Sequence, residues 1–278
     1  MKTKILKTGI LAILLAIFIS GCTTPSPNIG GDSNKAASIN DLEICVSKTP
    51  ITLNKDTLSE IMEKNKNLTL QNKEFTTDKK GSPLEAMVDI GSSREGVLVD
   101  ENGKNIEINC YNPAPKSKKP FADCVVYTIG SNDGAISINS LNKDTFYVDS
   151  AFDVLDKIGL SNVKNDKDRW IPEEYSFKYK TKDISVEITD IARNSETSRG
   201  QTYNCTISFP NEESAIVITL SKLNKEMAGV LSKEEIKETD KLKITQIGVA
   251  VKIPTTVTRN RVSTMFSQAP TTSISLGN

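Results

Sequence analysis

The sequence predicts an α+β fold in which antiparallel sheets are each backed by a short helix. Two observations predict it. Apolar and polar residues alternate along several short runs, as in strands with one buried face. Helix-capping signals stand between these runs. The length allows one large domain or two small ones, so the number of units depends on whether these signals repeat.

The order of the signals repeats once along the chain. Ile106 corresponds to Ile184, and Cys124 falls near Cys205, at offsets of 78 and 81 residues. A repeated order of elements is typical of tandem units, so we predict two βαβββ-like units and a C-terminal helix and strand. The predicted boundaries are 41–131 for the first unit, 132–225 for the second unit, 226–254 for the extension and 255–278 for a mobile tail.

The first unit is predicted to contain a strand over 42–46 and then a short helix. Thr57 and Glu60 have the spacing of a capping box, in which each side chain accepts a bond from the other residue's backbone N–H. Leu58 and Ile61 follow on one apolar stripe. We therefore expect a helix to begin in this segment.

A hairpin is predicted further along the first unit. The dipeptide Asn102-Gly103 stands between two alternating runs, which is the strongest short hairpin signal. A two-residue turn would pair Val99 with Ile106 on one face of the hairpin. It would place Leu98 on the opposite face.

Helix and strand signals of the same kinds mark the second unit and the extension. Ser150 precedes a helical run that ends at Gly159, a residue that commonly stops helices. Ser232 and Glu235 have capping-box spacing, and residues 243–254 alternate as a last strand. Further strands are expected over 135–138, 145–148, 177–179, 184–188, 203–209 and 214–220.

The N-terminus predicts export and lipid attachment. Three lysines precede an apolar core over 10–19, which is short for a bilayer span but suits the signal peptide that we assign to residues 1–21. Ile19-Ser20-Gly21-Cys22 resembles the lipobox of bacterial lipoproteins. The resemblance implies cleavage before Cys22 and attachment of fatty acyl chains, palmitate among them, to its thiol. The protein is therefore expected to be anchored in the cell membrane, facing outside the cytoplasm.

Charge and composition bear on the partners of the mature chain. Residues 22–40 are rich in Ser, Thr, Pro, Gly and Asn and predict a flexible tether that carries the lipid. Without the three signal-peptide lysines, 32 basic residues stand against 35 acidic ones, which argues against a nucleic-acid partner. The compact basic run over 116–119 predicts a solvated loop, with anionic lipid or wall polymer as its alternative partner.

Four further cysteines predict up to two disulfides, with three possible connectivities: Cys45, Cys110, Cys124 and Cys205. Cys110 and Cys124 flank a loop between two strand-like runs and are the favoured pair. Cys45 and Cys205 would then form the second bond, or both would remain reduced in the core.

Histidine is absent from the chain, which excludes Ser-His-Asp, Cys-His and His-based zinc chemistry. A serine with a lysine base would remain possible. Ser140 with Lys143 and Ser161 with Lys164 have the S-x-x-K spacing, but a chain rich in Ser and Lys contains such pairs by chance. Ser161 also lacks a helix start in the sequence, so we assign no catalytic role to either pair.

Paired carboxylates could hydrolyse glycans without histidine. Asp153 with Asp156, or Glu173 with Glu174, are the neighbouring pairs to consider. Asp153 is also explained by the helix dipole and Asp156 by contact with solvent, and a single tryptophan offers little aromatic surface to hold a sugar. The short acidic turns lack the spacing of a calcium loop, and the cysteines lack C-x-x-C spacing. We predict no cofactor and no metal site.

Aromatic residues near the second helix form a possible interface. Trp170, the single tryptophan, stands between that helix and the following strand, with Tyr175 and Tyr179 nearby. An aromatic residue at such a joint more often fills the edge of the core, and Tyr175 and Tyr179 share a face with Phe177, so the core interpretation is favoured. If these residues are exposed, they would anchor an interface, as tryptophan and tyrosine often do.

The order of motifs also carries a family resemblance. ITLNKDTLSEIMEK, IEINCYNPAPKSKKPFADCVVYTI and SAFDVLDKIGL resemble a group of two-part extracellular lipoproteins of Gram-positive bacteria. The plan is more remotely similar to the tandem fold of the β-lactamase inhibitor protein and to small outer-membrane-assembly lipoproteins. The resemblance implies a helix-backed sheet repeated twice, with an exposed face that binds a protein.

Together these observations predict a lipid-anchored protein of the cell envelope. Its expected role is that of a non-enzymatic binding or interaction module for a protein or cell-wall partner. The alternatives are a carboxylate-dependent glycan hydrolase and a solute-binding lipoprotein.

Overall fold

The computed structural model describes residues 38–71, 82–132, 134–142, 147–191, 201–222 and 241–253. These residues form a strand-rich α+β fold of mostly antiparallel sheet with few helices, which confirms the predicted class. The signal peptide, Cys22, the helix expected after Ser232 and the tail over 255–278 lie outside the described residues.

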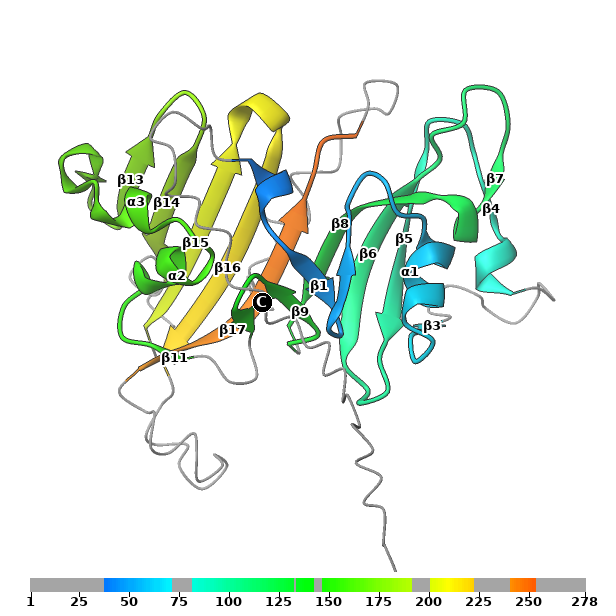
Figure 1. The fold of residues 1–278 in the computed structure, drawn as a ribbon, viewed down its shortest axis with the longest axis horizontal. Helices are drawn as coiled ribbons and strands as arrows, with labels where there is room; N and C mark the ends of the chain where they lie inside the picture. The colour runs from blue at the N-terminus through cyan, green and yellow to red at the C-terminus, as the bar shows by residue number, and fades with distance from the viewer. Residues whose placement is uncertain are drawn as a thin grey trace, which may run out of the picture.

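An eleven-stranded sheet runs through the whole molecule (Figure 1). Its strands, from one edge to the other, are β12 (Ile171–Pro172), β13 (Ser176–Lys180), β14 (Ser185–Asp190), β15 (Thr202–Phe209), β16 (Ser214–Lys222), β17 (Leu242–Ala250), β8 (Val125–Ser131), β6 (Asn105–Tyr111), β5 (Ser93–Val99) and β3 (Thr69–Gln71). In addition, β11 (Tyr147–Val148) pairs with β17. Every pairing is antiparallel.

The last strand, β17, joins the two halves of the sheet. It lies between β16 and β8, and its residues Ile247 to Ala250 pair with Ser131 to Thr128. The strand expected over 243–254 is therefore not an appendage. It occupies the centre of the sheet, where both of its edges are paired.

One face of this sheet carries the helices and a smaller sheet (Figure 1). The helices are α1 (Leu58–Lys64), α2 (Asp153–Lys157) and α3 (Ser161–Asn165). The smaller sheet has the order β10 (Leu141–Asn142), β9 (Ile136–Ile138), β1 (Ile44–Val46) and β2 (Thr49–Ile51). Short 3-10 helices are η1 (Ile39–Asp41), η2 (Pro83–Glu85), η3 (Phe121–Asp123), η5 (Lys167–Arg169) and η7 (Pro210–Glu212), and β4 (Met87–Val88) pairs with β7 (Lys119–Pro120).

The two layers enclose one continuous hydrophobic core. Leu58 of α1 and Leu155 of α2 belong to the same buried cluster as Ile129 of β8 and Ile218 of β16. Full burial of an aliphatic side chain of this size contributes about 1.5–3 kcal/mol. The core therefore stabilises the two halves as one body.

Local signals explain the start of α1 and the end of α2. The Thr57 hydroxyl accepts a bond from the backbone N–H of Glu60 at 3.3 Å, and the Glu60 carboxylate accepts one from the N–H of Thr57 at 2.8 Å. The predicted capping box is thus confirmed. Gly159 ends the α2 segment at φ +87°, a conformation that glycine adopts without strain.

The predicted register of the Asn102-Gly103 hairpin is wrong by one residue. Val99 pairs with Asn105, and Leu98 pairs with Ile106, so Leu98 is buried in the core instead of lying on the opposite face. The loop has three central residues because the Asp100 carboxylate accepts bonds from the backbone N–H groups of Asn102 and Lys104. Gly103, at φ +77°, supplies the left-handed residue that such a loop requires.

Candidate functional site

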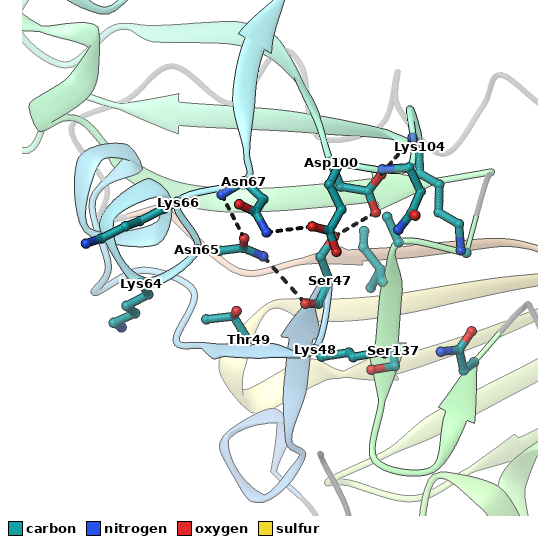
Figure 2. Close-up of a pocket in the computed structure, with 16 residues that line it drawn as sticks. Ser47, Lys48, Thr49, Lys64, Asn65, Lys66, Asn67, Asp100, Lys104 and Ser137 are labelled. Carbon is teal, nitrogen blue, oxygen red and sulfur yellow. Dashed lines mark hydrogen bonds between the residues drawn. The ribbon is translucent and has the colours of Figure 1, made fainter. Parts of the chain in front are cut away.

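A polar pocket of about 330 Å³ lies where four chain segments meet at one side of the first half (Figure 2). The segments are the β1–β2 turn, the connection from α1 to β3, the β5–β6 loop and the chain around β9. Its lining residues are Ser47, Lys48, Thr49, Lys64, Asn65, Lys66, Asn67, Asp100, Glu101, Asn102, Lys104, Gly134, Ala135, Ile136, Ser137 and Asn142.

Asp100 fixes one wall of the pocket. This carboxylate is only 8% exposed and accepts bonds from the hydroxyl of Ser47 at 3.1 Å and from the backbone N–H groups of Asn102 and Lys104, both at 2.9 Å. A buried carboxylate with three donors is already satisfied. Its role here is to hold the β5–β6 loop against the β1–β2 turn.

The connection from α1 to β3 forms a second wall. The Asn65 amide donates to the carbonyl of Ser47 at 3.5 Å and accepts from the backbone N–H of Asn67 at 3.3 Å. The Asn67 amide then donates to Glu101 at 2.6 Å, so this wall is linked to the β5–β6 loop (Figure 2). Glu101, the second carboxylate in the lining, therefore also holds two walls of the pocket together.

Four lysines give the pocket its charge: Lys48, Lys64, Lys66 and Lys104. Lys64 forms an ion pair with Asp56 at 2.8 Å. Lys48 stands in a two-residue turn in which Ser47 and Lys48 both have positive φ, the geometry that suits a tight hairpin. Figure 2 shows Lys64 and Lys66 on one side of the pocket and Lys104 on the opposite side.

This arrangement is suited to binding an anionic, hydroxyl-bearing group. Lysine ammonium groups bind phosphate and carboxylate as point charges. The lining amides and hydroxyls can both donate to and accept from sugar-like hydroxyls. The two lining carboxylates accept bonds from wall residues, and four lysines share the lining with them.

The structure places the predicted aromatic interface mainly inside the fold. Trp170 packs 4.9 Å from Phe152 and 5.5 Å from Tyr179, measured between ring centroids, and its indole N–H donates to the carbonyl of Val163 at 2.9 Å. Tyr179 is buried, and its hydroxyl donates to Asp166 at 3.1 Å. Trp170 is partly buried, and Tyr175 is 37% exposed.

The Asp153 and Asp156 carboxylates both bind one lysine. The Lys164 ammonium lies 2.7 Å from Asp153 and also contacts Asp156. The hydrogen bonds to these two carboxylates raise the pKa of Lys164, so this amine is protonated and is no general base for Ser161. Ser161, expected to lack a helix start, in fact begins the short helix α3.

The other candidate groups are also occupied. Glu173 pairs with Lys178 at 2.7 Å and accepts from the hydroxyl of Ser176 at 3.2 Å. Glu174 is exposed. The Ser140 hydroxyl donates to the carbonyl of Lys157 at 3.0 Å, while Lys143 lies outside the described residues.

The cysteines differ from the disulfide expectation. Cys110, Cys124 and Cys205 are free, buried thiols, so neither Cys110–Cys124 nor Cys45–Cys205 is bonded in the structure. Burial raises the pKa of Cys110, raises that of Cys124 to about 11 and raises that of Cys205 to about 12. The physical reason is that a thiol packs as a small apolar group in a dry core, where its thiolate is disfavoured. Cys45 is buried on β1.

Within the described ranges, no cluster of three or more His, Cys, Asp or Glu residues is placed to hold a metal ion. No helix in the same part of the chain has both the length and the apolar character needed to cross a membrane. Comparison of the chain with protein families, with characterised proteins and with solved structures finds no match.

Sequence reasoning missed the pocket because its lining comes from segments that are far apart in the chain. Two local signals could have pointed to it. One is the run Lys64-Asn65-Lys66-Asn67 directly after a predicted helix, and the other is the polar hairpin loop that ends at Lys104. Neither signal shows that the two loops meet.

Proposed function

We propose that the chain is a lipid-anchored protein of the cell envelope that acts as a non-enzymatic binding module. The anchor is the acylated thiol of Cys22, and the module faces outside the cytoplasm. Its partner belongs to the protein or cell-wall components there. The observation that carries the proposal is the lysine- and asparagine-lined pocket, whose walls are already cross-linked by hydrogen bonds.

The ligand class that fits this pocket is an anionic, hydroxyl-rich segment of a wall polymer. Such a polymer offers phosphate or carboxylate groups to Lys48 and Lys104 and hydroxyls to the Asn side chains. The pocket walls are held before any ligand arrives, which lowers the entropic cost of binding.

A hydrolase has less support from the geometry. The candidate carboxylates Asp153, Asp156 and Glu173 each bind a lysine in the second half, away from the lining of the pocket. A solute-binding role would use the same pocket for a small free anion, and it is distinguished from the polymer role by competition.

We also infer that the two halves are tandem βαβββ-like units. In each half a helical segment packs on the same face of the sheet and is followed by an edge strand, β3 after α1 and β12 after α3. Neither predicted unit, 41–131 or 132–225, contains β17, which pairs with a strand of each half.

The test is retention of purified anionic wall polymer on the immobilised protein. The double variant Lys48→Gln, Lys104→Gln is compared with the control Lys167→Gln, Lys182→Gln, whose lysines are exposed in the second half. Loss of each charge-assisted contact should weaken binding by about tenfold, so the double variant should bind at least about tenfold more weakly than the control. Retention should fall with salt, while a neutral glycan of similar size should not bind.

Three outcomes would change the proposal. Equal losses in both double variants would show non-specific attraction. Competition by free inorganic phosphate as strong as by polymer would favour a solute-binding role. Shortening of the glycan, abolished by Glu173→Gln or Asp153→Asn, would favour the hydrolase.

A further inference from the structure

The β4–β7 end of the molecule combines exposed apolar and basic side chains. Met87 is 55% exposed and Ile90 is 50% exposed, although both are large hydrophobic residues. They lie beside the loop that carries Lys116, Lys118 and Lys119, because Met87 pairs with Pro120 in the β4–β7 ribbon. We call Met87, Ile90, Lys116, Lys118 and Lys119 the basic tip.

Hydrogen bonds of a buried asparagine hold the basic tip in shape. The Asn112 side chain is 1% exposed, and its amide donates to the carbonyl of Val88 at 3.0 Å and to that of Ser117 at 2.9 Å. Its backbone N–H donates to the carbonyl of Ser92 at 3.0 Å. The loop that carries Ile90 and the loop that carries the lysines are thus tied together.

The charges of the basic tip are available to an external anion. Lys118 pairs with Asp89 at 2.6 Å, but both side chains are more than 60% exposed, at 63% and 65%. An ion pair in such exposed positions is weak and is readily exchanged for another anion. Exposed apolar side chains among lysines are typical of surfaces that rest in the headgroup region of an anionic bilayer.

We propose that the basic tip contacts anionic membrane lipid and so orients the protein on the bilayer. This inference rests on the proposed location at the membrane surface. The 15 residues between Cys22 and Ser38 can span up to roughly 50 Å when extended, so the anchor alone does not decide which face meets the bilayer. The second contact, between the basic tip and anionic lipid, decides which face meets the bilayer.

The test attaches the protein to vesicles without its natural lipid. The chain from residue 22 onward, with Cys22→Ser, carries a hexahistidine tag at its N-terminus and is held on nickel-chelating lipids. It lacks only residues 1–21, none of which belongs to the described fold. An environment-sensitive dye is placed at Ile90→Cys, and a control dye at Asn162→Cys, an exposed site on α3.

On phosphatidylcholine vesicles that contain phosphatidylglycerol, the dye at position 90 should shift to the blue and be quenched by a lipid-borne quencher, while the control dye should not. Lys116→Gln with Lys118→Gln and Lys119→Gln should abolish the shift, and Lys167→Gln with Lys182→Gln should leave it. An unshifted dye at position 90 on the vesicles that contain phosphatidylglycerol, or a shift that survives the triple variant, would overturn the inference.

The same design separates this inference from the proposed function. Failure of acylation at Cys22 in cells would remove the natural anchor without affecting the vesicle result, because the tag replaces the lipid. Failure of the pocket lysines to retain wall polymer would likewise not change the dye shift that the basic tip is expected to give on vesicles.

Discussion

At the two ends of the large sheet, different kinds of side chain occupy the space where a helical segment joins the sheet: aromatic at one end and polar at the other. At the β12 end, Phe152, Trp170 and Tyr179 pack between the helices and the sheet with ring centroids 4.9–5.5 Å apart, and Phe177, which is 43% exposed, contacts Phe152 at their edge. At the other end, the connection from α1 to β3 is lined by Lys64 to Asn67, and a pocket of about 330 Å³ remains open.

The difference shows how one architecture can have one end packed with aromatic rings, here called the sealed end, and one end with an open polar pocket, here called the receptive end. Aromatic rings pack densely and exclude water. Asparagine and lysine side chains keep their polar ends solvated or hydrogen-bonded, so the same position stays accessible. The candidate site therefore lies at the end where the joining segment is polar.

The largest expected effect is at the sealed end. Trp170→Ala removes a partly buried ring, its two aromatic contacts and its bond to Val163. It should lower the free energy of unfolding by about 3–5 kcal/mol, measured by urea denaturation. The control Tyr175→Ser, at an exposed position, should change it by less than about 0.5 kcal/mol. A stable Trp170→Ala protein that loses only partner binding would restore the interface interpretation.

At the receptive end, Asp100→Ala should have the next largest effect. It leaves three donors without their carboxylate, so the free energy of unfolding should fall by roughly 2–3 kcal/mol. Thermal unfolding of Glu101→Ala provides the comparison, because Glu101 accepts only from the Asn67 amide in this wall. An equal loss in both variants would contradict the special role assigned to Asp100.

The buried thiols of both halves predict a pH effect on stability. The folded pKa of Cys124 is about 11 and that of Cys205 about 12, both raised by burial above the value of an unfolded thiol. Each thiol therefore stabilises the fold below its unfolded pKa, and this contribution is lost as pH rises toward the folded pKa. The loss should be about 1.4 kcal/mol per pH unit for each thiol.

Urea denaturation at pH 8 to 10.5 should show this decline, and Cys205→Ala should have a shallower slope than the wild type. Alkylation at pH 8 should leave Cys110, Cys124 and Cys205 unmodified until the protein unfolds. Rapid alkylation of the native protein would show that the thiols are accessible.

The smallest expected effect concerns the helix caps. Thr57→Ala removes the capping box of α1 and should cost about 1 kcal/mol by thermal unfolding. Glu63→Ala, on an exposed position of the same helix, is the matched control. The N-cap residue of α2, Phe152, makes no side-chain capping bond, so α2 depends on its buried Val154 and Leu155 instead. A neutral Thr57→Ala would mean that packing alone also holds α1.

Local chemistry made part of this fold predictable. The Thr57–Glu60 spacing located α1, and Gly159 marked the end of the α2 segment. The hairpin at Asn102-Gly103 was also found, but its register was missed. The cause is that Asp100 bonds two backbone N–H groups of the loop and lengthens it by one residue, which moves Leu98 into the core.

The sequence by itself determined α1, α2 and most of the longer strands, because alternation, caps and turns act between residues close in the chain, but it did not predict α3. Only the tertiary structure decided that β17 joins the halves, that Trp170 is packed inside and that Ser47, Asn67 and Asp100 surround one pocket. These outcomes depend on contacts between distant segments. Such contacts are selected by the burial and hydrogen bonding of the whole chain, which no local pattern records.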